Sequence, residues 1–188
     1  YVLKGNTERT DSLHLAYSTD GKNFEAFNNN SPVHFTMLGS KKIGSPVIFR
    51  KADGTFGLIA TDDNANRYVI VADSEDLTSF KNERYVALNN KNLAVTDLVC
   101  YYDSEDGVYN IYWESSDGNV YLSTTTDFKS FGEPEKMPYK QTEMTVDSLP
   151  EGAIERSVIA LREEEFEKVF GRYGRGVNIG VTYEKEIK

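Results

Sequence analysis

The clearest structural signal in this 188-residue chain is the run Val47-Ile48-Phe49-Arg50, which leads through Asp53-Gly54 to Phe56-Gly57-Leu58-Ile59-Ala60-Thr61. Asp-Gly between two apolar runs is a strong signal for a β-hairpin, because glycine adopts the positive φ that a tight turn needs. Alternate residues of the second run fall on one face of an extended strand. We therefore predict two antiparallel strands here rather than a helix.

The same arrangement returns about fifty residues later. Val99-Cys100-Tyr101-Tyr102 leads through Asp106-Gly107 to Val108-Tyr109-Asn110-Ile111-Tyr112-Trp113. Each pair of runs is followed by a further alternating run that ends in a turn of the form Asp-x-x-x-Phe.

Three such turns occur, at Asp20 to Phe24, Asp76 to Phe80 and Asp127 to Phe131. In such a turn Asp accepts hydrogen bonds from backbone N–H groups and Phe packs onto the core, so we interpret it as structural.

Each repeat therefore describes a four-stranded antiparallel meander of about 50 residues, the size of a propeller blade. We predict an all-β fold of about three β-propeller blades in residues 1–160. A two-sheet sandwich also has short strands and frequent turns, but the regular repeat favours blades. Closed propellers usually have about four to eight blades. Missing blades or a second chain would then complete the ring.

Residues 161–188 have a different pattern. Between Leu161 and Tyr173 apolar side chains fall near one helical face, glutamates crowd the first turn, and Gly174 can end the helix. Val177, Ile179 and Val181 then alternate as a short strand. We predict a C-terminal helix and a short strand packed on the blades; a helix that binds a partner is the alternative.

The composition excludes several classes of protein. Asp and Glu number 30 against 21 Lys and Arg, a net charge of −9 that repels phosphates, so we predict no nucleic-acid partner. No run of about 18 apolar residues predicts a membrane span. Cys100 is the only cysteine, which excludes a disulfide within the chain and indicates a buried thiol. We expect an extracellular or periplasmic location, although no targeting segment is visible.

The inner strands of a propeller converge on its axis, so acidic residues near their ends could surround one pocket. Cleavage of a glycosidic bond needs two carboxyl groups, one as acid and one as base or nucleophile. The acidic candidates are Asp62, Asp97 and Glu155 for catalysis and Glu114 for substrate binding. Trp113 could stack on a sugar, and His14 is a further candidate for substrate binding. Phosphate-binding, dinucleotide-binding and zinc-protease motifs are missing, so we predict neither cofactor nor metal.

The run Leu13-His14-Leu15-Ala16-Tyr17-Ser18-Thr19-Asp20-Gly21 resembles the opening blade of five-bladed propeller glycosidases of the glycoside hydrolase family 43 type. The next blade of these enzymes is similar to two runs of this chain, Ser45-Pro46-Val47-Ile48-Phe49-Arg50 and Asp53-Gly54-Thr55-Phe56. The turn at the end of their strands resembles the segment from Ser74 to Phe80. The resemblance implies an incomplete five-bladed propeller. It also implies a glycan substrate that contains arabinose or xylose, as in arabinofuranosidases and xylosidases, hydrolysed by two carboxylates.

The chain departs from this family at two positions. Such enzymes usually carry Arg-Asp-Pro where this chain has Gly44-Ser45-Pro46, so Ser45 takes the place of a functional aspartate and is expected beside the substrate. Val99 stands where they carry an acid, with Asp97 two residues earlier. Two hypotheses follow: a glycoside hydrolase with the acids named above, or a non-catalytic propeller-like domain that binds carbohydrate or a protein partner.

Overall fold

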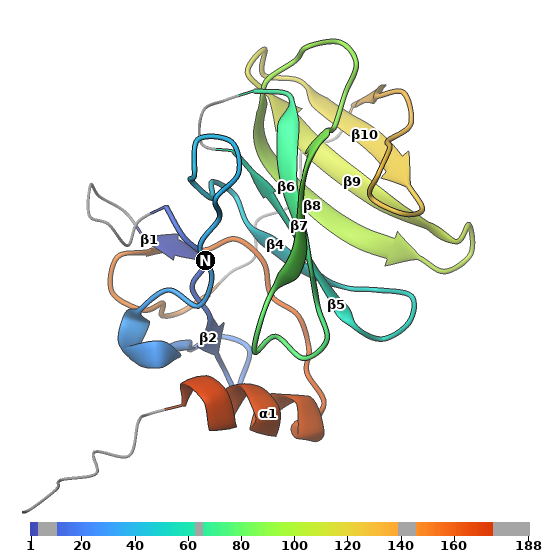
Figure 1. The fold of residues 1–188 in the computed structure, drawn as a ribbon. Coiled ribbons are helices and arrows are strands. Elements are labelled where there is room, and N and C mark those ends of the chain that lie inside the picture. The colour runs from blue at the N-terminus through green and yellow to red at the C-terminus, as the bar shows by residue number, and fades with distance from the viewer. Residues whose placement is uncertain (4–10, 63–65, 139–145, 175–188) are drawn as a thin grey trace, which may run out of the picture.

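A computed structural model describes residues 1–3, 11–62, 66–138 and 146–174 (Figure 1). These residues form antiparallel sheets, a short 3₁₀ turn at Asn28–Asn30 and one α-helix, α1 (Glu163–Tyr173). The predicted all-β class with a C-terminal helix is confirmed, and the sheets have the form of a partial propeller. No helix in this described part is long and apolar enough to cross a membrane.

The first complete blade contains the hairpin predicted from Asp53-Gly54. Its strands pair in chain order: β4 (Val47–Arg50), β5 (Phe56–Thr61), β6 (Tyr68–Ser74) and β7 (Lys81–Ala87). Val47 pairs with Ile59 and Arg50 with Phe56. Gly54 has a φ of +86°, which explains why glycine is required in this turn.

The second complete blade has the same connectivity. Its strands are β8 (Val95–Asp103), β9 (Val108–Ser115), β10 (Val120–Thr125) and β11 (Glu135–Met137), and they also pair in chain order. Alternate residues of β8 and β9 pack against the face of the first blade. The core between the blades includes Val47, Phe49, Ile59, Leu98, Cys100, Ile111 and Trp113. Cys100 is therefore the buried thiol that the sequence predicted, and burial raises its pKa.

Two two-stranded sheets bring an early and a late segment of the chain together. β1 (Val2–Leu3) pairs with β12 (Ala153–Ile154), and β2 (Ala16–Tyr17) pairs with β3 (Glu25–Ala26). Tyr1 joins the two pairs, because it donates to the carbonyl of His14 at 3.0 Å and accepts from its N–H at 2.9 Å. Joined in this way, the two sheets follow the order β12, β1, β2, β3, which is that of a four-stranded blade, the third, whose innermost strand comes late in the sequence.

The three Asp-x-x-x-Phe turns share one geometry. In each, the residue after Asp has a positive φ, and its N–H donates to a hydroxyl two residues before the Asp. The donor and acceptor pairs are Gly21 to Ser18, Leu77 to Ser74 and Phe128 to Thr125, at 2.8 to 3.0 Å. The aspartates themselves accept from the backbone N–H groups of Lys22, Thr78 and Lys129. The structural interpretation of these turns is confirmed.

Helix α1 lies at the foot of the first blade and beside β2 (Figure 1). Val169 and Tyr173 join the cluster that contains Leu15, Phe27 and Leu77. The Tyr173 hydroxyl donates to the Thr78 carbonyl at 2.6 Å, which attaches the helix to the turn after β6. The predicted helix therefore packs on the blades, whereas the strand predicted at 177–181 lies outside the described residues.

Candidate functional site

A hollow of about 860 Å³ lies where the inner segments of the three blades meet. Its walls are β4, the central part of β8, and residues 154–159, which begin in β12. Each of these segments is the first strand of its blade in the spatial order. The expectation that inner strands converge on a shared pocket therefore agrees with the arrangement of the described residues.

Three of the predicted acids line this hollow. Asp97 on β8 stands directly across from Glu114 on β9, so the two carboxylates project from one face of the sheet. A register shift between Val95 and Asp97 marks a bulge at this point, a device that re-aims side chains at pockets. Glu155 reaches the same hollow from the segment after β12.

Arg156 places a positive charge among these acids. Its Nη1 lies 3.8 Å from Oδ1 of Asp97, whose side chain is 49 % exposed. This ion pair joins β8 to the segment after β12, which come from different blades. The hollow therefore offers carboxylates and a guanidinium group, which can donate to and accept from the hydroxyls of a sugar.

Asp62 lies apart from these residues. It is 2 % exposed, follows β5, and forms a bridge with Ile43. Its carboxylate accepts hydrogen bonds from Tyr85 Oη at 2.5 Å, Asn66 Nδ2 at 3.1 Å and the Ser40 N–H at 3.2 Å. Burial acts to raise the pKa of Asp62, but these hydrogen bonds outweigh it and lower the pKa. The geometry is that of a structural carboxylate, and Asp62 is not among the residues that line the hollow.

The other predicted binding residues are buried. Trp113 is 1 % exposed, donates from Nε1 to Ser123 Oγ at 3.1 Å and stacks on Tyr121. His14 is fully buried beside Tyr1. These placements put both side chains in the core rather than on the hollow.

Ser45 is also buried, at the point where the chain enters β4. Its N–H donates to Thr61 Oγ1 at 2.9 Å, and its hydroxyl donates to the Thr96 carbonyl at 3.4 Å. Because Thr96 precedes Asp97, Ser45 connects the first strand of one blade to the acid-bearing strand of the next. Its contacts are those of a structural link.

Sequence reasoning missed Tyr101, an aromatic residue on the hollow. Tyr101 is 46 % exposed and stacks on Tyr112 with ring centroids 6.0 Å apart and an interplanar angle of 17°. A hydrogen bond with Tyr112 and burial raise the pKa of Tyr101 to about 12. Strand alternation contained the signal, because Tyr101 is four residues from Asp97 and shares its face.

The part of the chain that the structure describes contains no group of three His, Cys, Asp or Glu side chains placed to hold a metal ion. The hollow itself presents carboxylates, a guanidinium group and a tyrosine ring. Acids are the groups that glycosidic hydrolysis uses, and an aromatic ring can cover the apolar face of a sugar.

Residues 1–150 match a family model described as a probable glycosyl hydrolase domain. The match covers most of the chain, so the chain belongs to this family. Searches among curated proteins and among solved structures found no match. The family assignment confirms the resemblance inferred from the sequence at the level of a glycosyl hydrolase-related domain.

Proposed function

We propose that the hollow binds a glycan that contains arabinose or xylose and that Asp97 and Glu155 hydrolyse a glycosidic bond of this glycan. The observation that carries the proposal is the meeting of Asp97, Glu114 and Glu155 on one hollow in a chain of the glycosyl hydrolase class. A glycan-degrading role also fits the extracellular or periplasmic location expected from the sequence.

The surroundings of each acid suggest its role. An ion pair uses the charged carboxylate, so Asp97 beside Arg156 takes the role of base or nucleophile. Glu155, which lines the hollow from the segment after β12, then protonates the leaving oxygen. Glu114 accepts hydrogen bonds from sugar hydroxyls, and the exposed ring of Tyr101 packs on the apolar face of the sugar.

One observation favours the alternative, a non-catalytic domain that binds glycan. Ser45 stands at the position where the resembling enzymes carry aspartate, and its buried hydroxyl is bonded to a backbone carbonyl. A neutral hydroxyl cannot replace a carboxylate in the hydrolytic mechanism. In this second reading the same hollow binds sugar without cleaving it.

The two functions are separated by turnover of aryl α-L-arabinofuranosides and β-D-xylosides. The hydrolase proposal predicts that Asp97→Asn and Glu155→Gln each lower kcat/KM by about 10²- to 10⁴-fold. Glu151→Gln is the matched control, because Glu151 is exposed and does not line the hollow. Hydrolysis that both active-site variants retain would refute the assignment, whereas glycan binding without turnover in the unmodified protein would support the non-catalytic domain.

A further inference from the structure

The second complete blade packs on the first through one of its two faces. Figure 1 shows it at one side of the molecule, with the first complete blade beside it. Leu98, Cys100 and Ile111 point toward the first blade and belong to the shared core. The residues between them on β8 and β9 point to the other face, because successive side chains of a strand alternate between its two faces.

This other face carries two tyrosines among aliphatic and small polar side chains. We call it the tyrosine face and define it by six residues on β8, β9 and β10, which are Val99, Tyr101, Asn110, Tyr112, Leu122 and Thr124. Tyr101 is 46 % exposed and the other five are partly exposed. None of the six belongs to either apolar core among the described residues. The tyrosine face is therefore open to a ligand.

The tyrosine face is held in one arrangement by the sheet beneath it. Its side chains form two rows across the three strands, Val99, Tyr112 and Leu122 in one and Tyr101, Asn110 and Thr124 in the other. The rings of Tyr101 and Tyr112 stack across these rows, with centroids 6.0 Å apart and an interplanar angle of 17°. The Tyr101 side chain is also hydrogen bonded to Tyr112 and Asn110. Both rings are thus fixed before any ligand binds.

The tyrosine face continues into the hollow of about 860 Å³, because Tyr101 belongs to both. Asp97 and Glu114 stand opposite each other on the same side of the sheet, in the row next to Val99 and Tyr112. Asp97 is four residues from Tyr101, about 13 Å along β8 at about 3.3 Å per residue. The acids and the tyrosine face therefore form one surface that is longer than a single sugar residue.

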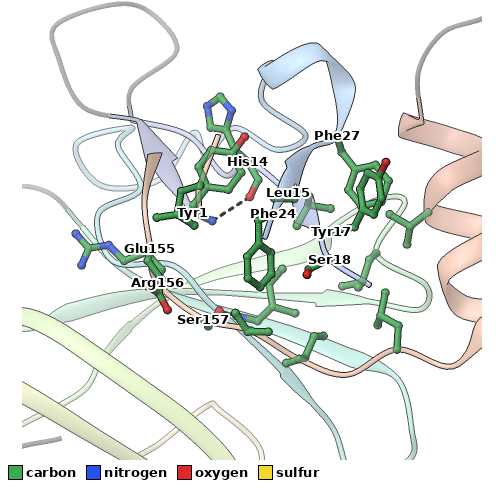
Figure 2. A pocket seen from close by; sticks show the side chains of 18 of the residues that line it. Tyr1, His14, Leu15, Tyr17, Ser18, Phe24, Phe27, Glu155, Arg156 and Ser157 are labelled. Atoms are coloured by element: carbon green, nitrogen blue, oxygen red, sulfur yellow. Dashed lines mark hydrogen bonds between the residues drawn. The ribbon is translucent and has the colours of Figure 1, made fainter. Parts of the chain in front are cut away.

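A second cavity adjoins the hollow in another direction. This groove of about 500 Å³ shares residues 155–159 with the hollow, and Figure 2 shows Leu15, Phe24 and Phe27 around it. Leu15 and Phe27 belong to the core that helix α1 covers. The apolar side chains in this lining offer no partners to sugar hydroxyls, whereas amide and hydroxyl groups lie beside the rings of the tyrosine face. The tyrosine face is therefore the better continuation of a glycan site.

We propose that a glycan bound at Asp97 and Glu155 places its further sugar residues on the tyrosine face, so that the ligand is an oligosaccharide chain rather than a single terminal sugar. This inference rests on the proposed glycan function of the hollow. Tyr101 and Tyr112 cover the apolar faces of these sugar residues, and Asn110 exchanges hydrogen bonds with their hydroxyls. Because the rings are already fixed, little conformational freedom is lost on binding.

A second copy of the chain is the other occupant that an open sheet face can take, and the charges disfavour it. Asp97 precedes the tyrosine face on β8 and Asp103 follows it, and strand alternation puts both on its side of the sheet. Two copies packed face to face would bring acids together whether their strands ran parallel or antiparallel. A neutral sugar adds no charge, and its hydroxyls can donate to carboxylates.

The test is to measure the affinity for xylobiose and for xylohexaose by isothermal titration, in proteins that all carry Glu155→Gln so that no glycan is cleaved. With Tyr112 intact, we expect xylohexaose to bind at least tenfold more tightly than xylobiose. Tyr112→Leu, which keeps an apolar side chain, should remove this gain and leave the affinity for xylobiose within about twofold. Tyr68→Leu is the matched control and should keep the gain, because Tyr68 stacks on Tyr85 in the first complete blade.

A second measurement needs no change at Tyr112. Xylohexaose, but not xylobiose, should shift the backbone amide signals of Asn110, Tyr112 and Thr124 in the ¹⁵N-labelled protein. Equal affinities for the two sugars, or no such shifts, would overturn this inference alone, because xylobiose would still occupy the hollow. Failure of both sugars to bind would overturn the glycan site and the inference together. A dimer in sedimentation that Tyr112→Leu dissociates would also overturn the inference, because a second copy would then cover the tyrosine face.

Discussion

The guanidinium of Arg156 lies 3.8 Å from the carboxylate of Asp97. This contact joins two blades across the acidic hollow, the hollow of about 860 Å³ that Asp97, Glu114 and Glu155 line. The two residues are 156 − 97 = 59 positions apart in the sequence. Their meeting depends on β12, whose pairing with β1 places the segment after it beside β8. The pairing of β1 with β12 therefore brings Glu155 and Arg156 to the hollow that Asp97 and Glu114 already line.

Arg156 should act by positioning Asp97 and by contacting the glycan. We expect Arg156→Met to weaken glycan affinity about tenfold, because it removes a charged donor while keeping much of the side-chain volume. Arg156→Lys should recover part of this loss. Isothermal titration with an arabinoxylo-oligosaccharide measures both, and an unchanged affinity in Arg156→Met would show that the guanidinium makes no contact with the sugar.

Asp62 should contribute to stability rather than to catalysis. Asp62→Ala leaves the donors of Ser40, Asn66 and Tyr85 without their acceptor, and we expect a loss of about 3 kcal/mol in the free energy of unfolding. Tyr85→Phe, which removes one donor, should cost about 1 kcal/mol. Urea unfolding followed by tryptophan fluorescence measures both changes. If Asp62→Ala matched the exposed control Asp106→Asn in stability, the structural role would be wrong.

The titration of Asp62 adds a pH dependence of known sign. Because its pKa is lowered in the folded protein, its contribution is present above the ordinary value of 3.8 and is lost as the pH falls through the folded pKa. We expect unfolding curves of Asp62→Asn to lose less stability than the unmodified chain on acidification below about pH 4. The same acid sensitivity in both proteins would contradict this assignment.

Many of the contacts just described lie beyond what the sequence could predict. The Asp-Gly hairpins of β4–β5 and β8–β9 were predictable, since turn residues and strand alternation act within a few positions. The pairing of Val2 with Ile154 was not, because two short segments at opposite ends of the chain carry no local signal of contact. Only the β2–β3 part of the third blade could therefore be predicted from the sequence.

The same reasoning applies to the site. Asp97 and Glu155 were candidates because they adjoin predicted inner strands, and both line the hollow, but their relation to Arg156 required the fold. Trp113 shares strand parity with Tyr109 and Ile111, and that alternation already indicated a buried face. By the same rule Tyr101 shares a face with Asp97. Alternation, applied to every aromatic residue, would have favoured the tyrosine over the tryptophan as the sugar-stacking surface.

Glu165 should anchor helix α1 to the first blade. It is buried and accepts from Arg50 Nη1 and Nη2 at 2.7 and 2.9 Å and from Arg162 Nη2 at 2.6 Å, and the first of these pairs contributes most to lowering its pKa. Glu165→Gln should cost about 2 kcal/mol, since it removes the carboxylate charge that pairs with Arg50 and Arg162. Glu164→Gln, at an exposed neighbouring position, should change stability by less than about 1 kcal/mol. Equal effects of the two changes on urea unfolding would exclude an anchoring role.

The most direct test of the account is to titrate the ¹⁵N-labelled protein with an arabinoxylo-oligosaccharide and to follow backbone amide shifts. We expect saturable shifts at Asp97, Tyr101, Glu114 and Glu155, and at least a fivefold weaker affinity in Tyr101→Ala. This result holds whether the domain cleaves the glycan or only binds it. Shifts confined to residues outside the acidic hollow, or none at about 10 mM sugar, well above a weak Kd of about 1 mM, would contradict the assignment of this hollow as the glycan site.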